Sequence, residues 1–229
     1  MHVPDGFLDA PTSVAAGVVA AAGVAVALRG ARRELDDRTA PLAGLVATFI
    51  FAVQMLNFPV AGGTSGHLLG GALAAVLVGP ATGVLCVSVV LLVQALLFAD
   101  GGITALGTNI VLMAIVTVVV GWVVFRGLQT VLPKRASMVA PAAAVAALVS
   151  VPAASLAFVM LYEIGGAVDI PLPTLVAAMV GVHTLIGIGE AAITFLAVGS
   201  IMLVRPDLVH GARRVVATRE LVVRKEVVA

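Results

Sequence analysis

The chain has 229 residues, of which 61% are hydrophobic and only 11% are charged, and its formal net charge is +1. Soluble domains usually carry about a quarter charged residues, so this composition excludes an ordinary soluble domain and predicts an all-α bundle of membrane-spanning helices. The small net charge gives no support to nucleic-acid binding, and the single cysteine excludes a disulfide framework.

A helix needs about 20 apolar residues to cross a lipid bilayer. The apolar runs predict about seven spans, of which the third ends at Pro80 and is short enough to be a half-helix or a strongly tilted helix. The seventh is too long for one straight span, and Gly181, Gly187 and Gly189 could break or kink it. The predicted spans are Pro11–Leu28, Pro41–Leu56, Leu68–Gly79, Thr82–Phe98, Thr108–Phe125, Met138–Tyr162 and Thr174–Val204.

All 13 Lys and Arg residues follow the first, fifth and seventh spans. Basic residues collect in cytoplasmic loops, so this pattern predicts an outer N-terminus, a cytoplasmic C-terminus and a multi-pass protein of the cell membrane. The opposite side carries only acidic charges, at Asp5, Asp9, Asp100, Glu163 and Asp169. Residues 1–205 form the predicted membrane domain, and residues 206–229 form a predicted cytoplasmic tail.

One stretch, from Gln54 to Gly71, interrupts the apolar spans with the helix-breaking residues Pro59, Gly62, Gly63 and Gly66. Non-helical backbone at membrane depth must be surrounded by protein or water, so we expect a loop folded back into the protein with His67 at its end. His67 alone is typical of a hydrogen-bonded loop histidine, and His2 alone of an exposed terminal residue. Together with Met1, in a chain so short of polar groups, they indicate a metal site on the outer side.

The amino terminus has chelating chemistry of its own. No basic segment precedes the first apolar run, so we expect no cleaved signal peptide and a retained Met1. The Met1 amine and the His2 amide nitrogen close a five-membered ring on a metal, and that amide and the His2 Nδ1 close a six-membered ring. An imidazole from His67 would complete four nitrogens in a plane, which suits Ni(II) or Cu(II). Binding would release protons.

Other polar residues in or near the spans are candidates for supporting roles around the metal. Asn57, Thr64 and Ser65 could orient His67 or merely cap helix ends. Asp100 and Asn109 bracket a second outer loop and could pair with the first loop or face water. His183 and Glu190 are seven residues apart, on one helix face, and form either a functional pair or a structural hydrogen-bonded pair. Gly17, Ala21 and Ala25 form a small-residue stripe that permits close helix approach, within the protein or to a partner helix.

Several of these segments together resemble the CbiM/NikM family, the substrate-binding membrane components of cobalt and nickel energy-coupling-factor transporters. In that family the metal is held by the terminal amine, the second-residue histidine and the loop histidine, which correspond here to Met1, His2 and His67. The resemblance covers roughly residues 1–205. Its motifs are Met-His-Val-Pro-Asp-Gly-Phe-Leu at the start, Gln54–Gly71, Gln94–Gly102, Leu106–Asn109 and His183–Ala191.

The resemblance implies a substrate-capture subunit that binds Co²⁺ or Ni²⁺ as its transported substrate, with no organic cofactor. It also implies three kinds of partner: a transmembrane coupling protein, cytoplasmic ABC-type ATPase subunits and often a small accessory membrane protein. The sequence has no phosphate-binding P-loop motif, so we expect no ATPase activity from the chain itself. The donor atoms do not choose between the two metals, although the opening motif slightly favours cobalt.

Two other function classes remain open from the sequence. A stand-alone secondary permease driven by an ion gradient usually shows repeated halves and midplane carboxylates, and only Glu190 fits that pattern. A membrane enzyme using the same metal needs an open coordination position for water, and four planar nitrogens leave only axial positions.

Overall fold

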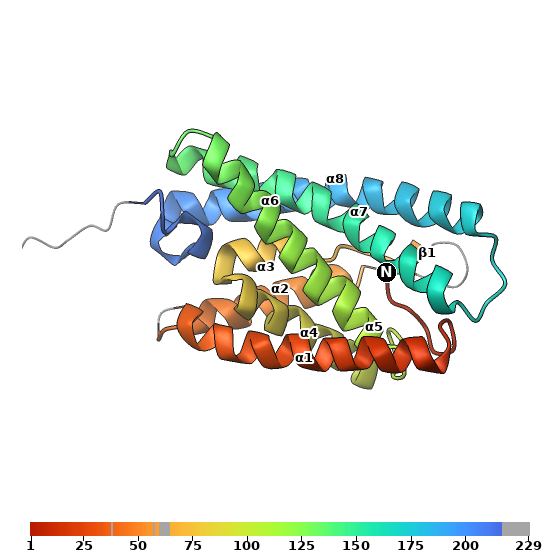
Figure 1. Ribbon diagram of the computed structural model, residues 1–229. Coiled ribbons are helices and arrows are strands. Elements are labelled where there is room, and N and C mark those ends of the chain that lie inside the picture. Colours follow the sequence, from red (N-terminus) through yellow and green to blue (C-terminus); the bar gives the residue numbers. More distant parts are fainter. Residues whose placement is uncertain (38, 57, 60–64, 217–229) are drawn as a thin grey trace, which may run out of the picture.

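The computed structural model describes residues 1–37, 39–56, 58–59 and 65–216, and the statements below refer to these residues. The chain is a helical bundle, as its composition predicts (Figure 1). Its elements are α1 (Ala10–Glu34), α2 (Ala40–Gln54), β1 (Phe58–Pro59), β2 (Ser65–Gly66), α3 (Gly71–Val78), α4 (Pro80–Leu97), α5 (Leu106–Asn109), the π-helix η2 (Ile110–Val116), α6 (Thr117–Val131), the 3-10 turn η3 (Ala136–Met138), α7 (Val139–Gly165), α8 (Leu172–Val204) and the 3-10 turns η4 (Pro206–Leu208) and η5 (His210–Ala212).

The helices pack around the short helix α3. α8 lies along α7, α7 packs against α6, and α1 packs against α4 on the other side of the bundle (Figure 1). All eight residues of α3 are buried, and α3 contacts α4, α6 and α7. Small residues allow this close packing, because a Cβ atom on Gly121 of α6 would lie 2.6 Å from the Cβ of Ala72.

Five helical segments among the described residues are long and apolar enough to cross a membrane. They are α1, α4, the continuous run Leu106–Val131, the run Ala136–Gly165, and α8; α2 is apolar but has only 15 residues. The third predicted span is the eight-residue α3, which agrees with the expected half-helix. The chain is therefore a multi-pass membrane protein, and the number of crossings stays a prediction.

The expected break in the last span is wrong. α8 runs without interruption for 33 residues through Gly181, Gly187 and Gly189. A Cβ atom on Gly187 would lie 3.1 Å from the carbonyl oxygen of Leu148 in α7, so this glycine allows two helices to approach closely instead of ending one. In lipid a continuous helix also keeps its backbone hydrogen bonds satisfied internally.

The junction between α3 and α4 is a true break. Gly79 has φ +98°, which glycine adopts without strain, and Pro80 begins α4 because its missing N–H is not needed there. Glu34 at the end of α1 accepts hydrogen bonds from the Ala81 and Thr82 amides at 3.1 and 2.7 Å. These bonds satisfy the first amides of α4 and tie that helix to α1.

The basic and acidic ends of the chain separate in space. The α1–α2 and α6–α7 connections and the segment after α8 lie at one end of the bundle, and the α7–α8 connection lies at the other (Figure 1). Residues 206–216 fold against the bundle, with Val209 and Ala212 buried and the Gly211 carbonyl accepting a hydrogen bond from Gln129 at 2.8 Å. The predicted tail residues after position 216 lie outside the described residues.

Candidate metal centre

The N-terminal segment threads into the bundle. Met1 is 1% exposed, His2 4% and Val3 0%, so the predicted alternative of an exposed terminal histidine is wrong. Backbone hydrogen bonds hold the segment from two sides: the Gly102 amide donates to the Val3 carbonyl at 3.0 Å, and the Ala167 amide donates to the Phe7 carbonyl at 3.0 Å. The buried amino terminus is thus a fixed part of the structure.

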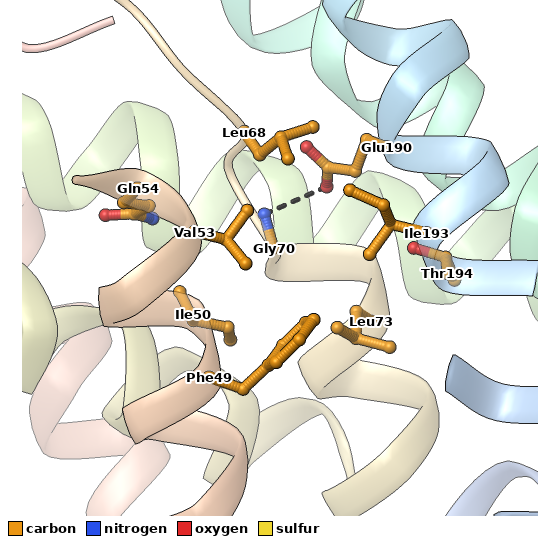
Figure 2. A pocket seen from close by; sticks show the side chains of 10 residues that line it. All are labelled: Phe49, Ile50, Val53, Gln54, Leu68, Gly70, Leu73, Glu190, Ile193 and Thr194. Carbon is orange, nitrogen blue, oxygen red and sulfur yellow. Dashed lines mark hydrogen bonds between the residues drawn. The ribbon is translucent and has the colours of Figure 1, made fainter. Parts of the chain in front are cut away.

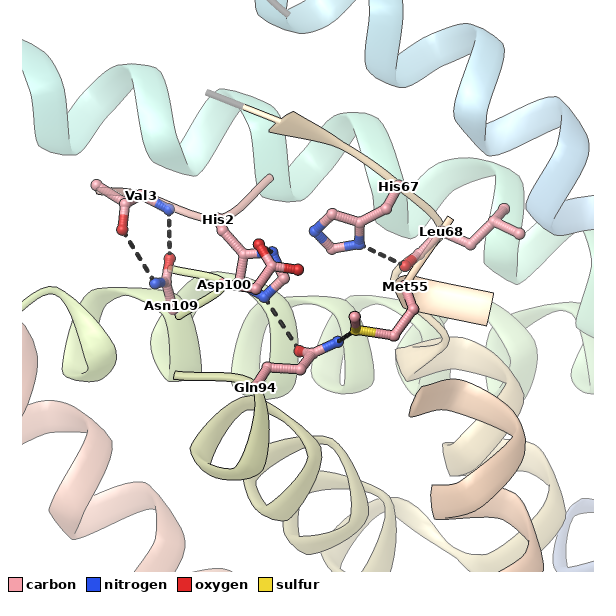
Figure 3. Close-up of polar contacts among 8 residues, drawn as sticks. All are labelled: His2, Val3, Met55, His67, Leu68, Gln94, Asp100 and Asn109. Carbon is pink, nitrogen blue, oxygen red and sulfur yellow. Dashed lines mark hydrogen bonds and ion pairs between the residues drawn. The ribbon is translucent and has the colours of Figure 1, made fainter. Parts of the chain in front are cut away.

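Asn109 makes two hydrogen bonds to Val3, the residue after His2. Its Oδ1 accepts a hydrogen bond from the Val3 amide at 2.8 Å, and its Nδ2 donates to the Val3 carbonyl at 3.2 Å (Figure 3). The Asn109 side chain therefore pairs with the backbone amide and carbonyl of Val3, as the backbone of a neighbouring β-strand would. It is the last residue of α5, directly before the π-helix η2, and π-helical segments occur frequently at functional sites.

His67 follows β2, which pairs antiparallel with β1 in the register Phe58↔Gly66 and Pro59↔Ser65. The His67 side chain is fully buried. Its Nδ1 donates a hydrogen bond to the Leu68 carbonyl at 2.8 Å, and its Nε2 makes no hydrogen bond within the described part of the chain. The centroids of the His2 and His67 rings lie only 4.5 Å apart. The two histidines therefore lie together, as the sequence predicts.

The His2 ring is oriented by two polar neighbours (Figure 3). Its Nε2 donates to Gln94 Oε1 at 3.1 Å, which leaves Nδ1 as the nitrogen with a lone pair. That Nδ1 lies 3.2 Å from Asp100 Oδ1 and makes no hydrogen bond among the described residues. The ring is therefore held between the Gln94 amide oxygen and the Asp100 carboxylate.

Burial keeps these donors in the neutral form that binds metals. It lowers the pKa of the Met1 amine well below its usual value, although the nearby Asp100 charge opposes the change. Burial, with the terminal amine as the next contribution, lowers the pKa of His2 to about 4 and the pKa of His67 to well below its usual value. Burial thus shifts all three groups toward the neutral form.

The donor set fits a transition metal only if the amino terminus takes part. No group of three or more His, Cys, Asp or Glu side chains in the described residues could hold a metal ion. The His2 Nδ1 and the His67 Nε2 supply two lone pairs, and the Met1 amine is the third buried nitrogen donor. The His2 amide, which donates no hydrogen bond within the described chain, is available as the fourth.

The two ionisable residues of α8 do not pair with each other, so the predicted His183–Glu190 hydrogen bond is wrong. The His183 Nδ1 donates to the Met179 carbonyl of its own helix at 2.7 Å. The Glu190 carboxyl accepts the amides of Leu69 and Gly70 at 2.7 and 2.9 Å. Seven-residue spacing puts the two side chains on one helix face, but each bonds to nearer backbone groups, and the His183 Nε2 has no hydrogen-bond partner among the described residues.

The remaining predicted residues are less informative. Asn57 and Thr64 lie outside the described residues, as does the Ser65 side chain. In the predicted stripe, a Cβ on Gly107 would lie 2.5 Å from the Gly17 Cα, so Gly17 packs against α5. Ala21 and Ala25 are exposed on α1.

Two glutamines near the centre were not assigned roles from the sequence. Gln94 orients His2, Asp100 faces its Nδ1, and the Gln54 side-chain amide donates to the Leu69 carbonyl at 2.7 Å. Gln54 and Gln94 are both fully buried at the ends of apolar helices. A lone amide in such a position must find a partner, and that was the signal available in the sequence.

Comparisons with known proteins agree on one family. Residues 2–208 match the CbiM model, described as the cobalt uptake substrate-specific transmembrane region. A Haloquadratum walsbyi protein named for metal transport is 43% identical over 91% of this chain and 93% of its own length. The cobalt transport protein CbiM of Geobacter sulfurreducens is 34% identical over 91% of this chain and 61% of its own length.

A solved structure has the same fold. The crystal structure of a truncated transition metal transporter is similar with a TM-score of 0.81 and 29% sequence identity, and the match covers 89% of this chain and 99% of that one. The family match over nearly the whole chain, the related transport proteins and the shared fold all point the same way. The chain belongs to the CbiM family and is a cobalt or nickel transport component of the cell membrane.

Proposed function

We propose that this chain is the substrate-capture component of an ATP-driven energy-coupling-factor transporter, and that it binds Co²⁺ or Ni²⁺ through Met1, His2 and His67. The observation that carries the proposal is the convergence of two buried nitrogens, the His2 Nδ1 and the His67 Nε2, beside the buried terminal amine. Neither nitrogen has a hydrogen-bond partner among the residues that the structure describes. With the His2 amide nitrogen these donors would make a four-nitrogen plane, a geometry that suits Ni(II) or Cu(II).

A pocket of about 350 Å³ reaches His2, one of the proposed ligands. It is lined by His2, Pro4, Asp5, Ala99, Asp100, Gly101 and Gly102. Two carboxylates at its wall attract divalent cations, and the Asp100 carboxylate lies next to the His2 Nδ1. A hydrated ion entering here would exchange its water for nitrogen donors at the base of the pocket.

The proposal requires energy from partners, namely a transmembrane coupling protein and ABC-type ATPase subunits, with a small accessory membrane protein as a further candidate. The expected result is that cells expressing this chain accumulate radioactive cobalt or nickel only when the coupling protein and ATPase subunits are co-expressed. A catalytically dead ATPase subunit is the control. Uptake by the chain alone that collapses with the ion gradient would instead identify a secondary permease.

The outer position of the site is tested by labelling single cysteines in intact cells. Cys86 is the only native cysteine and is buried, so a Cys86→Ala background is suitable. We expect Asp169→Cys to react with a membrane-impermeant maleimide and Arg33→Cys to react only after the cells are opened, because both positions are exposed at opposite ends of the bundle. The reverse pattern would refute capture from outside.

A further inference from the structure

The segment that follows His67 is held by two helices far away in the sequence. The Glu190 carboxyl of α8 accepts the Leu69 and Gly70 amides at 2.7 and 2.9 Å, one on each oxygen. From α2, the Gln54 amide donates to the Leu69 carbonyl at 2.7 Å. Figure 2 shows Glu190 reaching from α8 to Gly70, with Gln54 on the opposite side of the same segment.

This arrangement leaves the segment little freedom. Glu190 is 2% exposed, so water does not replace its bonds to the two amides. Gly70 has φ +79° and no side chain to cap α3, so the amides ahead of α3 depend on a partner from elsewhere. Gly71 packs directly against α6, because a Cβ there would clash with Thr117 Oγ1.

The position of His67 depends on this segment directly. The His67 Nδ1 donates to the Leu68 carbonyl, whose peptide unit contains the Leu69 amide that Glu190 accepts. Glu190 therefore fixes the peptide group that orients the imidazole and aims Nε2 toward the His2 ring. Outer partners that orient a ligand in this way typically contribute 10- to 100-fold to metal affinity.

We propose that Glu190 is a positioning residue for His67 and that it couples the placement of α8 to metal affinity. The inference rests on the proposed function, because it assigns Glu190 a role at the same metal centre. By linkage, a bound metal stabilises the contact between α8 and the loop to the same degree as that contact stabilises the bound metal. Movement of α8 away from the loop would release the histidine and weaken the site.

The test uses the full chain in detergent, titrated with NiCl₂ and CoCl₂. Glu190→Gln keeps the size of the side chain but replaces one acceptor oxygen with an NH₂ donor that faces a backbone amide. We expect affinity to fall roughly 10- to 100-fold, and the visible absorption bands of the bound Ni²⁺ to shift because the His67 ligand is displaced. Glu190→Asp, which keeps both oxygens, should recover part of the affinity and the parent spectrum.

Thr194→Val is the matched control. Thr194 lies one turn further along α8, is fully buried and lines, with Glu190 and Gly70, the small pocket drawn in Figure 2, but its hydroxyl group has no hydrogen-bond partner among the described residues. It should leave both affinity and spectrum unchanged. A Glu190→Gln protein with lower thermal stability but parent affinity and spectrum would overturn the inference, because Glu190 would then be merely structural.

Two further outcomes are distinguishable. If Glu190→Gln does not fold, the Glu190→Asp protein decides, and parent affinity with a parent spectrum in that variant overturns the inference. If the parent chain itself binds neither metal, the proposed function fails and the inference fails with it. If the parent chain binds metal and both Glu190 variants bind it equally well, the inference is refuted but the proposed function is not.

Discussion

Replacing His67 by alanine is expected to abolish high-affinity binding of Co²⁺ and Ni²⁺. The His67 Nε2 is buried within a ring contact of 4.5 Å to His2 and has no hydrogen-bond partner among the described residues. Loss of an outer partner typically costs 10- to 100-fold in metal affinity, so loss of the ligand itself should cost more than about 100-fold. His2→Ala should have an effect at least as large, since it removes an imidazole from the same plane. Titration calorimetry on the purified chain measures both.

His210→Ala is the control for this prediction. His210 is a half-buried histidine near the opposite, basic end of the bundle, where its ring lies 5.6 Å from that of Trp122. The same chemical change there should leave metal affinity at the parent value. If His67→Ala binds either metal as tightly as His210→Ala, then His67 is not a ligand and the proposed site is wrong.

The location of the site could be predicted because polar residues and helix breakers are so rare in this chain. The loop ending in His67 stood out against apolar spans, and the position of His2 beside the terminus suggested chelation. The structure brings the two rings together, in agreement with that reasoning.

The contacts around the site could not be predicted, because they join residues that are distant in the sequence. Seven-residue spacing placed His183 and Glu190 on one face of α8, but it carries no information about the loop that crosses that face and takes the Glu190 carboxyl. In the same way, nothing local to Gln94 indicates that its amide oxygen meets His2. Such partners are determined by how the helices pack. The apolar pattern of a membrane protein does not specify that packing.

Glycine was the least reliable guide. Its residues were read as helix breakers, and that holds at Gly79, where φ is +98° and Pro80 follows. In α8 the same residue type lies inside a continuous helix, because Gly187 provides room for the Leu148 carbonyl of α7. Sequence alone does not separate a glycine needed for its backbone angle from one needed for its small size.

A residue added before Met1 is expected to destroy metal binding as completely as loss of His2. The extension converts the Met1 amine into an amide and moves the new free amine out of the five-membered chelate ring. The side chains of His2 and His67 remain. The extension must also enter a buried site, since Met1 is 1% exposed and Val3 is held by Asn109. A tag placed after Ala229 should leave binding unchanged.

Steric disturbance is separated from loss of the amine by restoring the terminus. A tag joined through a protease site that leaves Met1 as the first residue should block binding before cleavage and allow full binding after it, with both states verified by mass. Acetylation of the Met1 amine, which adds few atoms, should block binding as well. An ordinary two-histidine site would retain affinity in the acetylated protein, because both rings are unchanged. Parent affinity in a fully acetylated chain would therefore exclude the terminal amine as a ligand while leaving His2 and His67 in place.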